Sequence, residues 1–370
     1  MATSTTDTPT PTTSSTASPS CTTAVPGKYG HVPFDACNSN YNDNPSFEAN
    51  LAFAALFGAS FVAHIVQAIH YKKRFCWVVI MGAAWETAAF SLRAIGAHHQ
   101  QELQYALWGQ LLFLLAPLWI NAFAYMTVAR MVYFGLPDKK IWGVRAVKLT
   151  VVFVWLDIVC FLVQLGGGVL LSNNDDAGLT RIGMKVYTAG IGLQLGFVVI
   201  FGTMTAWFWR RMRQVSRGQS MGRLRFLIWS MLAVLVLIMV RIIFRLLEFG
   251  PGINASNKLI TDETYPLVLD AMPMLLALAL LNLVHPGLVL RGPDGEFPRV
   301  TRREKKAARQ RAKEEKKRQK EARKAGSKSS FVDGDAARLA EDSDGYGVGG
   351  GRGGRTSANS WELGAVHERV

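Results

Sequence analysis

The chain has 370 residues, of which 49% are hydrophobic and only 18% are charged, and its formal net charge is +14. Charged residues make up about 25% of an ordinary soluble chain, so this shortfall, with a mean hydropathy of +0.15, excludes that class and indicates a membrane protein. The basic residues are densest from Arg299 to Lys328, so the net charge belongs mainly to a tail rather than to a nucleic-acid-binding domain.

Residues 1–45 are rich in Ser, Thr and Pro and contain no apolar run typical of a signal peptide. Such a composition cannot form a core and predicts an extracellular Ser/Thr-rich segment. Cys21 and Cys37 both fall in this segment, where an oxidising compartment would allow them to form a disulfide.

Repeated apolar runs follow within residues 46–291, each of about 20 residues and long enough to cross a hydrocarbon core. This pattern predicts an all-α, polytopic membrane protein with seven transmembrane helices. The expected spans are Phe47–Ile69, Cys76–Ile95, Tyr105–Val128, Lys148–Leu171, Val186–Trp209, Leu224–Leu247 and Leu267–Leu290.

The links between these runs differ in charge. Those after the first, third and fifth runs carry Lys and Arg, whereas those after the second, fourth and sixth are polar or acidic. Loops rich in Lys and Arg face the cytoplasm, so we expect the N-terminus outside and the C-terminus inside. Asn254 begins an N-glycosylation sequon in a link that this orientation places outside.

Residues 292–370 form a polybasic and Gly-rich tail, which the same orientation places in the cytoplasm. The only apolar residues from Thr301 to Ala325 are alanines, so this helix-forming segment lacks a face for membrane insertion. We expect it to lie near anionic lipid of the inner leaflet, and we expect no nucleic-acid partner.

Several charged residues fall inside the predicted spans, although an ionised side chain at the bilayer centre costs at least about 2.5–3.5 kcal/mol. They are Glu86, Arg93, Asp157, Arg241, Arg245, Glu248 and Asp270. One interpretation is a salt-bridge network that fixes helix packing. The other is a polar cavity that opens outward and binds a charged lipid head, with Glu86 and Asp157 available for proton coupling.

The same residues carry a family resemblance. They include Glu86 and Arg93 in an E-x6-R spacing, Asp157 with Gln164-Leu165-Gly166-Gly167-Gly168, Arg241-Ile242-Ile243-Phe244-Arg245-Leu246-Leu247-Glu248-Phe249, then Glu263, Tyr265 and Asp270, and finally His285-Pro286-Gly287. This set resembles the fungal lipid-translocating exporter family, which is named for resistance to aminocholesterol and includes sphingoid long-chain-base resistance exporters. The resemblance extends from Tyr29 to Leu290. It implies a seven-span fungal membrane protein linked to lipid movement or efflux and to stress resistance, and we expect the plasma membrane.

The leading hypothesis is therefore an ATP-independent translocase or exporter of amphiphilic lipids, such as sphingoid bases or sterol-like amines. The chain has no G-x-x-x-x-G-K-[ST] phosphate loop, and we expect neither enzyme activity nor a cofactor or metal. A seven-helix receptor or sensor for a lipid or small amphiphile remains the alternative, because it would share this topology. An intramembrane metal hydrolase is disfavoured, since no H-x-x-x-H pair occurs.

Overall fold

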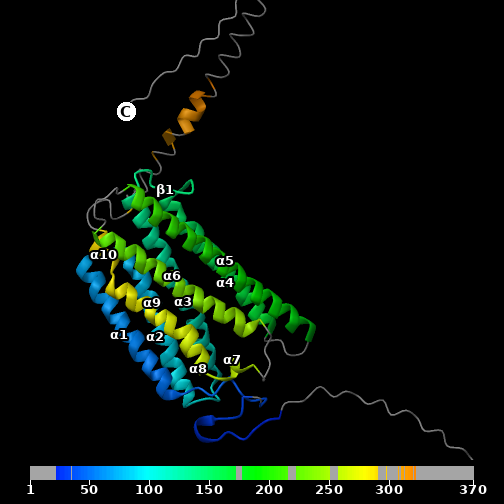
Figure 1. Cartoon of the computed structure of the whole chain (residues 1–370). Coiled ribbons are helices and arrows are strands. Elements are labelled where there is room, and N and C mark those ends of the chain that lie inside the picture. Colours follow the sequence, from blue (N-terminus) through cyan, green and yellow to red (C-terminus); the bar gives the residue numbers. More distant parts are fainter. Residues whose placement is uncertain are drawn as a thin grey trace, which may run out of the picture. The chain divides into compact units, whose positions relative to one another are not determined.

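The computed structural model describes residues 22–34, 36–171, 177–215, 222–250 and 257–290, together with 297, 307, 310, 311, 313–319 and 321. Seven helices in this part of the chain are long and apolar enough to cross a membrane, which confirms the predicted fold class (Figure 1). Two residues of interest, Cys21 and Asn254, lie outside the described residues.

The first six spans are single helices: α1 (Phe47–Tyr71), α2 (Trp77–Ala97), α3 (Leu103–Gly135), α4 (Ala146–Leu171), α5 (Ala177–Val215) and α6 (Gly222–Phe249). The seventh consists of α8 (Thr264–Pro266), the π-helical turn η3 (Leu267–Ala271), α9 (Met272–Leu283) and α10 (Pro286–Val289). The links contain the short helices η1 (Lys28–Gly30), η2 (Arg74–Cys76) and α7 (Lys258–Thr261), and an antiparallel hairpin of β1 (Lys140–Ile141) and β2 (Val144–Arg145).

The observed helices differ from the predicted spans mainly at their ends. Helix α3 continues past Val128 to Gly135, and α5 extends past both predicted ends. A hydropathy pattern ends at the first charged residues, whereas the backbone hydrogen bonds of a helix continue beyond the hydrocarbon core. The seventh span is continuously helical from Thr264 to Leu283, with the π-helical turn η3 inside it, and the helix breaks at Val284 and His285, directly before Pro286 of α10. The residue before a proline is disfavoured in the helical region, which explains the extended backbone of His285.

Helices that follow one another in the chain pack side by side from α1 to α6, and α9 then packs between α6 and α1 (Figure 1). Helix α3 also contacts α6, so these two helices meet inside the bundle. The α4–α5 pair is very close: a Cβ added at Gly167 would lie 2.6 Å from the backbone nitrogen of Tyr187. Small residues allow this approach, as is common between membrane helices.

Aromatic side chains fill the interior between these helices. Phe57 and Phe113 both contact the buried ring of Phe90, with centroids 5.4 Å and 5.6 Å away, respectively. Tyr125 and Phe201 form a second group, with centroids 4.5 Å apart. Large apolar side chains are exposed on the outer face, among them Trp155 of α4. This distribution suits a bundle whose surrounding solvent is lipid.

The two ends of the bundle are chemically different (Figure 1). The hairpin β1–β2 and α10 lie at one end, which we call the basic end because it also carries Lys72, Lys73 and Arg74. Helices α7 and α8 and the N-terminal segment, residues 22–46, lie at the other end, which we call the cavity end. Gathering of the basic links at one end is what the predicted orientation requires, and the orientation itself stays a prediction.

The polybasic tail belongs to a separate compact unit, which begins at Arg299. Residues 313–319 are helical and exposed, and Lys317 forms an ion pair with Glu321 at 3.9 Å. An exposed charged helix here agrees with the absence of an apolar face in the sequence.

Candidate functional site

A buried group of charged side chains connects the sixth and seventh spans. Asp270 is fully buried and forms ion pairs with Arg241 and, at 3.7 Å, with Arg245. Arg245 also pairs with Glu248 at 3.3 Å and donates a 2.6 Å hydrogen bond to the hydroxyl of Tyr187 on α5. We call Glu86, Arg241, Arg245, Glu248 and Asp270 the ionic cluster.

The backbone around Asp270 explains how this carboxylate reaches α6. Asp270 lies in the π-helical turn η3, and η3 packs directly against α6. A π turn adds a residue to the helical repeat and so rotates the side chains that follow, and such turns are frequent at functional sites.

Glu86 of α2 is the member of the ionic cluster with the fewest partners. It is fully buried, and it is close enough to Arg241 and Asp270 to interact with both electrostatically. Neither of its carboxyl oxygens accepts a hydrogen bond from a described residue. An ionised carboxylate without donors is costly to bury, so Glu86 is the member most in need of a proton or a ligand cation.

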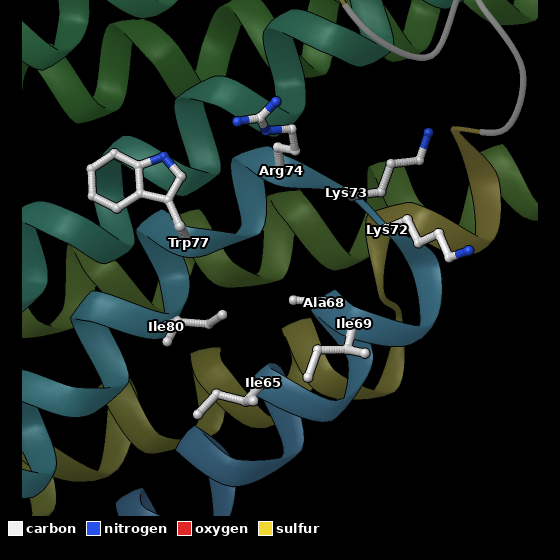
Figure 2. Close-up of a pocket in the computed structure, with 8 residues that line it drawn as sticks. All are labelled: Ile65, Ala68, Ile69, Lys72, Lys73, Arg74, Trp77 and Ile80. Carbon is white, nitrogen blue, oxygen red and sulfur yellow. The ribbon is translucent and has the colours of Figure 1, made fainter.

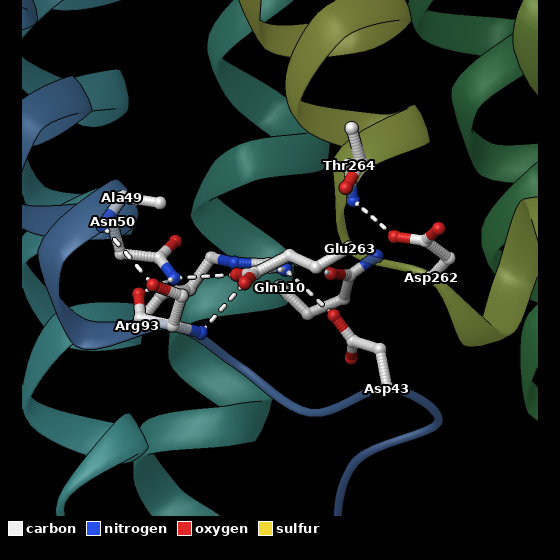
Figure 3. Close-up of polar contacts among 9 residues, drawn as sticks. Asp43, Ala49, Asn50, Arg93, Gln110, Asp262, Glu263 and Thr264 are labelled. Carbon is white, nitrogen blue, oxygen red and sulfur yellow. Dashed lines mark hydrogen bonds and ion pairs between the residues drawn. The ribbon is translucent and has the colours of Figure 1, made fainter.

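Arg93 connects three segments at the cavity end (Figure 3). Its Nη1 donates to Gln110 Oε1 of α3 at 3.2 Å. Its Nη2 lies 3.8 Å from Asp43 Oδ2 of the N-terminal segment and 4.0 Å from Glu263 Oε1, which directly precedes α8. Arg93 is thus one of the points at which the N-terminal segment is tied to the bundle.

Three acidic residues at this end have shifted pKa values, two raised and one lowered. Glu263 accepts hydrogen bonds from the backbone nitrogen of Ser46 at 2.6 Å and from Asn50 Nδ2 at 2.5 Å, yet burial raises its pKa (Figure 3). Burial also raises the pKa of Asp43, although nearby Arg93 opposes the shift. In contrast, the exposed Asp262 has a lowered pKa because it accepts a hydrogen bond from the backbone of Thr264.

A cavity of about 490 Å³ lies between these groups. Its lining includes Asp43, Arg93, Arg245 and Glu248, together with neutral polar and apolar side chains: Asn40, Tyr41, Asn42, Ala106, Gln110, Phe113, Leu114, Gly168, Leu171, Tyr187, Phe249, Ile260 and Pro266. A smaller recess of about 20 Å³ shares Leu114 and Arg245 with it and also reaches Arg241. The ionic cluster therefore borders a space that a ligand can occupy.

Asp157 stands apart from the other predicted site residues. It accepts hydrogen bonds from Asn121 Nδ2 and from the hydroxyl of Tyr125, each at 3.0 Å, and it forms no ion pair with a described residue and is not part of the ionic cluster. Of the seven residues selected from the sequence, five form the ionic cluster and Arg93 lies at the cavity beside it. The role of each residue in substrate binding stays a prediction.

Sequence reasoning missed Asp43, Gln110 and Tyr187 as site residues. Gln110 carried a usable signal, since it is a polar residue inside an apolar run. Tyr187 carried little, because tyrosine also occurs as an ordinary packing residue. Asp43 carried none, because hydropathy does not predict how the N-terminal segment folds over the bundle.

The N-terminal segment has its own internal bonds. Asn38 donates to the backbone oxygen of Ala24 at 3.0 Å and accepts from the backbone nitrogen of Ala24 at 3.1 Å. Cys37 is disulfide-bonded, and its predicted partner Cys21 lies outside the described residues. These bonds order the chain that leads to Tyr41 and Asp43, and Asn40 Nδ2 joins it to the bundle by donating to the backbone oxygen of Gln100 at 3.0 Å.

Seven apolar spans around a buried ionic cluster that borders a cavity define a multi-pass membrane protein with an intramembrane polar site. The chain belongs to the RTA1-like protein family: the model of this family, described as "RTA1 like protein", matches residues 79–293.

Among curated relatives, the chain is 40% identical over 302 residues to "Probable lipid transporter atnI" of Emericella nidulans, which covers 79% of each chain. It is 22% identical over 299 residues to "Sphingoid long-chain base transporter RSB1" of Saccharomyces cerevisiae, covering 69% of this chain and 75% of the relative. The chain is 30% identical over 204 residues to "Protein RTM1" of S. cerevisiae, covering 54% of this chain and 63% of the relative. No solved structure matches the chain.

Proposed function

We propose that this protein moves amphiphilic lipids with a cationic head across a membrane, without hydrolysing ATP. One observation carries the proposal: the cavity at one end of the bundle borders an ionic cluster that is rich in carboxylates. The names of two relatives, a probable lipid transporter and a sphingoid long-chain base transporter, support the same class of cargo. The absence of a phosphate-loop motif from the sequence supports ATP independence.

The charged residues that line the cavity balance one another, two carboxyl groups against two guanidinium groups, but the charge balance of the groups in and directly around it favours a cationic ligand. Three guanidinium groups, on Arg93, Arg241 and Arg245, meet more carboxyl groups than they can neutralise: those of Asp43, Glu86, Glu248, Glu263 and Asp270. An ammonium head in the cavity would offset this surplus, and the apolar lining would accommodate the adjoining part of the tail. A head that also carries a phosphate would meet Arg93 and Arg245 there.

Proton coupling is the energy source that the site favours. Glu86 is buried beside Arg241 and Asp270 without a hydrogen-bond donor among the described residues, so it can hold either a proton or the ligand cation. Exchange of one for the other would link lipid movement to proton movement. Asp157 is the second candidate for a coupling residue, held by Asn121 and Tyr125 away from the cavity.

The cellular part of the proposal concerns protection from toxic lipids. Export of sphingoid bases or sterol-like amines from the plasma membrane would lower their concentration in the cell and give resistance. Deletion of the gene should then sensitise cells to an added long-chain base, and re-expression of the intact protein should restore growth.

The transport proposal is tested in vesicles that contain only this protein and a fluorescent long-chain base, with and without a pH gradient. We expect flux with the intact protein, and a strong loss with Glu86→Gln and with Asp43→Asn. Asp262→Asn is the matched control, because Asp262 is exposed at the same end and does not line the cavity. Binding of the lipid without any flux would instead favour the receptor alternative.

A further inference from the structure

A second cavity, of about 530 Å³, lies at the basic end of the bundle (Figure 2). It is an open groove between the last turns of α1 and the first turns of α2. Its walls are the apolar side chains Ile65, Ala68, Ile69, Trp77 and Ile80, and the link between the two helices adds three cations to its lining. It shares no lining residue with the cavity at the other end.

The backbone explains why the three cations lie together. Lys72 caps α1 in the left-handed region, with φ of 52°, so the chain turns sharply directly after the helix. Lys73 and Arg74 follow at once, and α2 then begins at Trp77. Lys72 and Arg74 are exposed, and none of the three forms an ion pair with a described residue.

The groove combines exposed apolar walls, which are unfavourable in water, with cations, which are unfavourable in the hydrocarbon core. Ile69 is 71% exposed and Trp77 is 54% exposed, and both lie at an end of a membrane span. Tryptophan is enriched at the membrane–water interface, and basic residues at that level attract anionic lipid heads. Figure 2 shows Ile65 and Ile80 on facing sides of the groove, with the basic link at its end.

We propose that this groove binds an anionic phospholipid, with its phosphate held by Lys72, Lys73 and Arg74 and its acyl chain lying between α1 and α2. A free phosphate would use the cations but not the apolar walls. A lipid without net charge would use the walls but gain little from the cations. The groove shares no lining residue with the cavity at the other end, for which we propose a cationic ligand, so it is a separate site and does not depend on the proposed transport.

Native mass spectrometry of the purified full-length protein tests this proposal. The protein is incubated with equal amounts of phosphatidylserine and phosphatidylcholine, and retained lipid is counted. Because three positive charges are removed from the lining of the groove, K72Q/K73Q/R74Q should lower the retained phosphatidylserine by about tenfold. K139Q/K140Q/R145Q is the matched control, since it removes three exposed charges from the hairpin region at the same end and should change little.

The apolar half of the site needs its own variant. Ala68→Phe would fill the groove without changing charge, and it should also reduce retained phosphatidylserine. If Ala68→Phe lowers the melting temperature, Ile69→Gln replaces it, because Ile69 is largely exposed and its loss disturbs little packing.

Three results would overturn the proposal. Equal loss in the groove and hairpin triple variants would mean general surface attraction. Loss with the charge variant but with neither wall variant would mean that no acyl chain occupies the groove. Displacement of the lipid by soluble glycerol phosphate would mean that the site recognises a free phosphate.

Discussion

Asp270 of η3 lies with its Oδ2 atom 3.7 Å from Nη1 of Arg245 on α6, and the aspartate is fully buried there. The same carboxylate pairs with Arg241, so one acidic group compensates two buried guanidinium groups. Both arginines also have other partners: Arg245 contacts Glu248 and Tyr187, and Arg241 donates to the backbone oxygen of Phe113 at 3.5 Å. The seventh span is thereby linked to the third, fifth and sixth.

Asp270→Asn should destabilise the protein strongly. It removes the acidic partner of the buried Arg241 and one of the two acidic partners of Arg245, and breaking a buried pair from one side costs about 3–5 kcal/mol. Thermal unfolding of the purified protein in detergent measures the effect. Asp157→Asn is the control: its partners are neutral donors, so its cost should be nearer to about 1 kcal/mol. Equal losses would contradict the account of the ionic cluster.

Glu86→Gln should show whether Glu86 serves transport or only stabilises the packing of the helices. Glu86 accepts no hydrogen bond from a described residue, so its neutral isostere should leave the melting temperature nearly unchanged. Flux of a long-chain base in vesicles should nevertheless fall by at least about tenfold, the effect expected when a charged contact is lost. A drop in stability as large as that of Asp270→Asn, with flux retained in the surviving protein, would assign Glu86 to the scaffold.

Binding of a cationic lipid should weaken on acidification. Burial raises the pKa of Asp43 and of Glu263, so these groups take up protons at a higher pH than exposed carboxyls do. Their negative charge, and with it affinity for the cation, is present above the raised pKa and is lost as pH falls through it. Tyr41, whose pKa burial raises to about 12, stays neutral throughout and contributes nothing to this dependence.

Folding stability should respond to these two groups in the opposite sense. A raised pKa in the folded state means that folding takes up protons, so their contribution favours the folded state at low pH and is lost as pH rises through the folded pKa. A titration of lipid affinity and of melting temperature on the intact protein and on Asp43→Asn checks both signs. Affinity that increases on acidification would contradict the assignment of Asp43 as a contact for the cation.

The orientation gives a separate prediction. With the cavity end outside, an epitope at the N-terminus should be accessible on intact cells, and one at the C-terminus only after permeabilisation. Asn254→Gln should remove any glycosidase-sensitive mass, because the sequon falls in a link on the same side. An N-terminal epitope that is protected on intact cells would reverse the bundle and with it the direction in which the cavity opens.

The sequence predicted where the spans lie and which charged residues form the ionic cluster, but it did not predict the ion pairs between those residues. Span length follows from bilayer thickness, and the spacing of Arg241, Arg245 and Glu248 places them on one helix face. Which carboxylate they meet depends on packing between distant helices, so the sequence did not predict that Asp270, and not Asp157, is their ion-pair partner. The π turn that positions Asp270 has no hydropathy signal.

The most direct test of the central claim compares two cargoes in vesicles that contain only this protein. One is a fluorescent sphingoid base with a free ammonium group; the other is its N-acylated analogue, which has the same tail and no charge. The carboxylate surplus of the ionic cluster that borders the cavity predicts that the base crosses at least about tenfold faster than the analogue, and that Asp43→Asn narrows the difference in rate while Asp262→Asn does not. Equal rates for the two lipids would show that the cavity does not select the head by its charge.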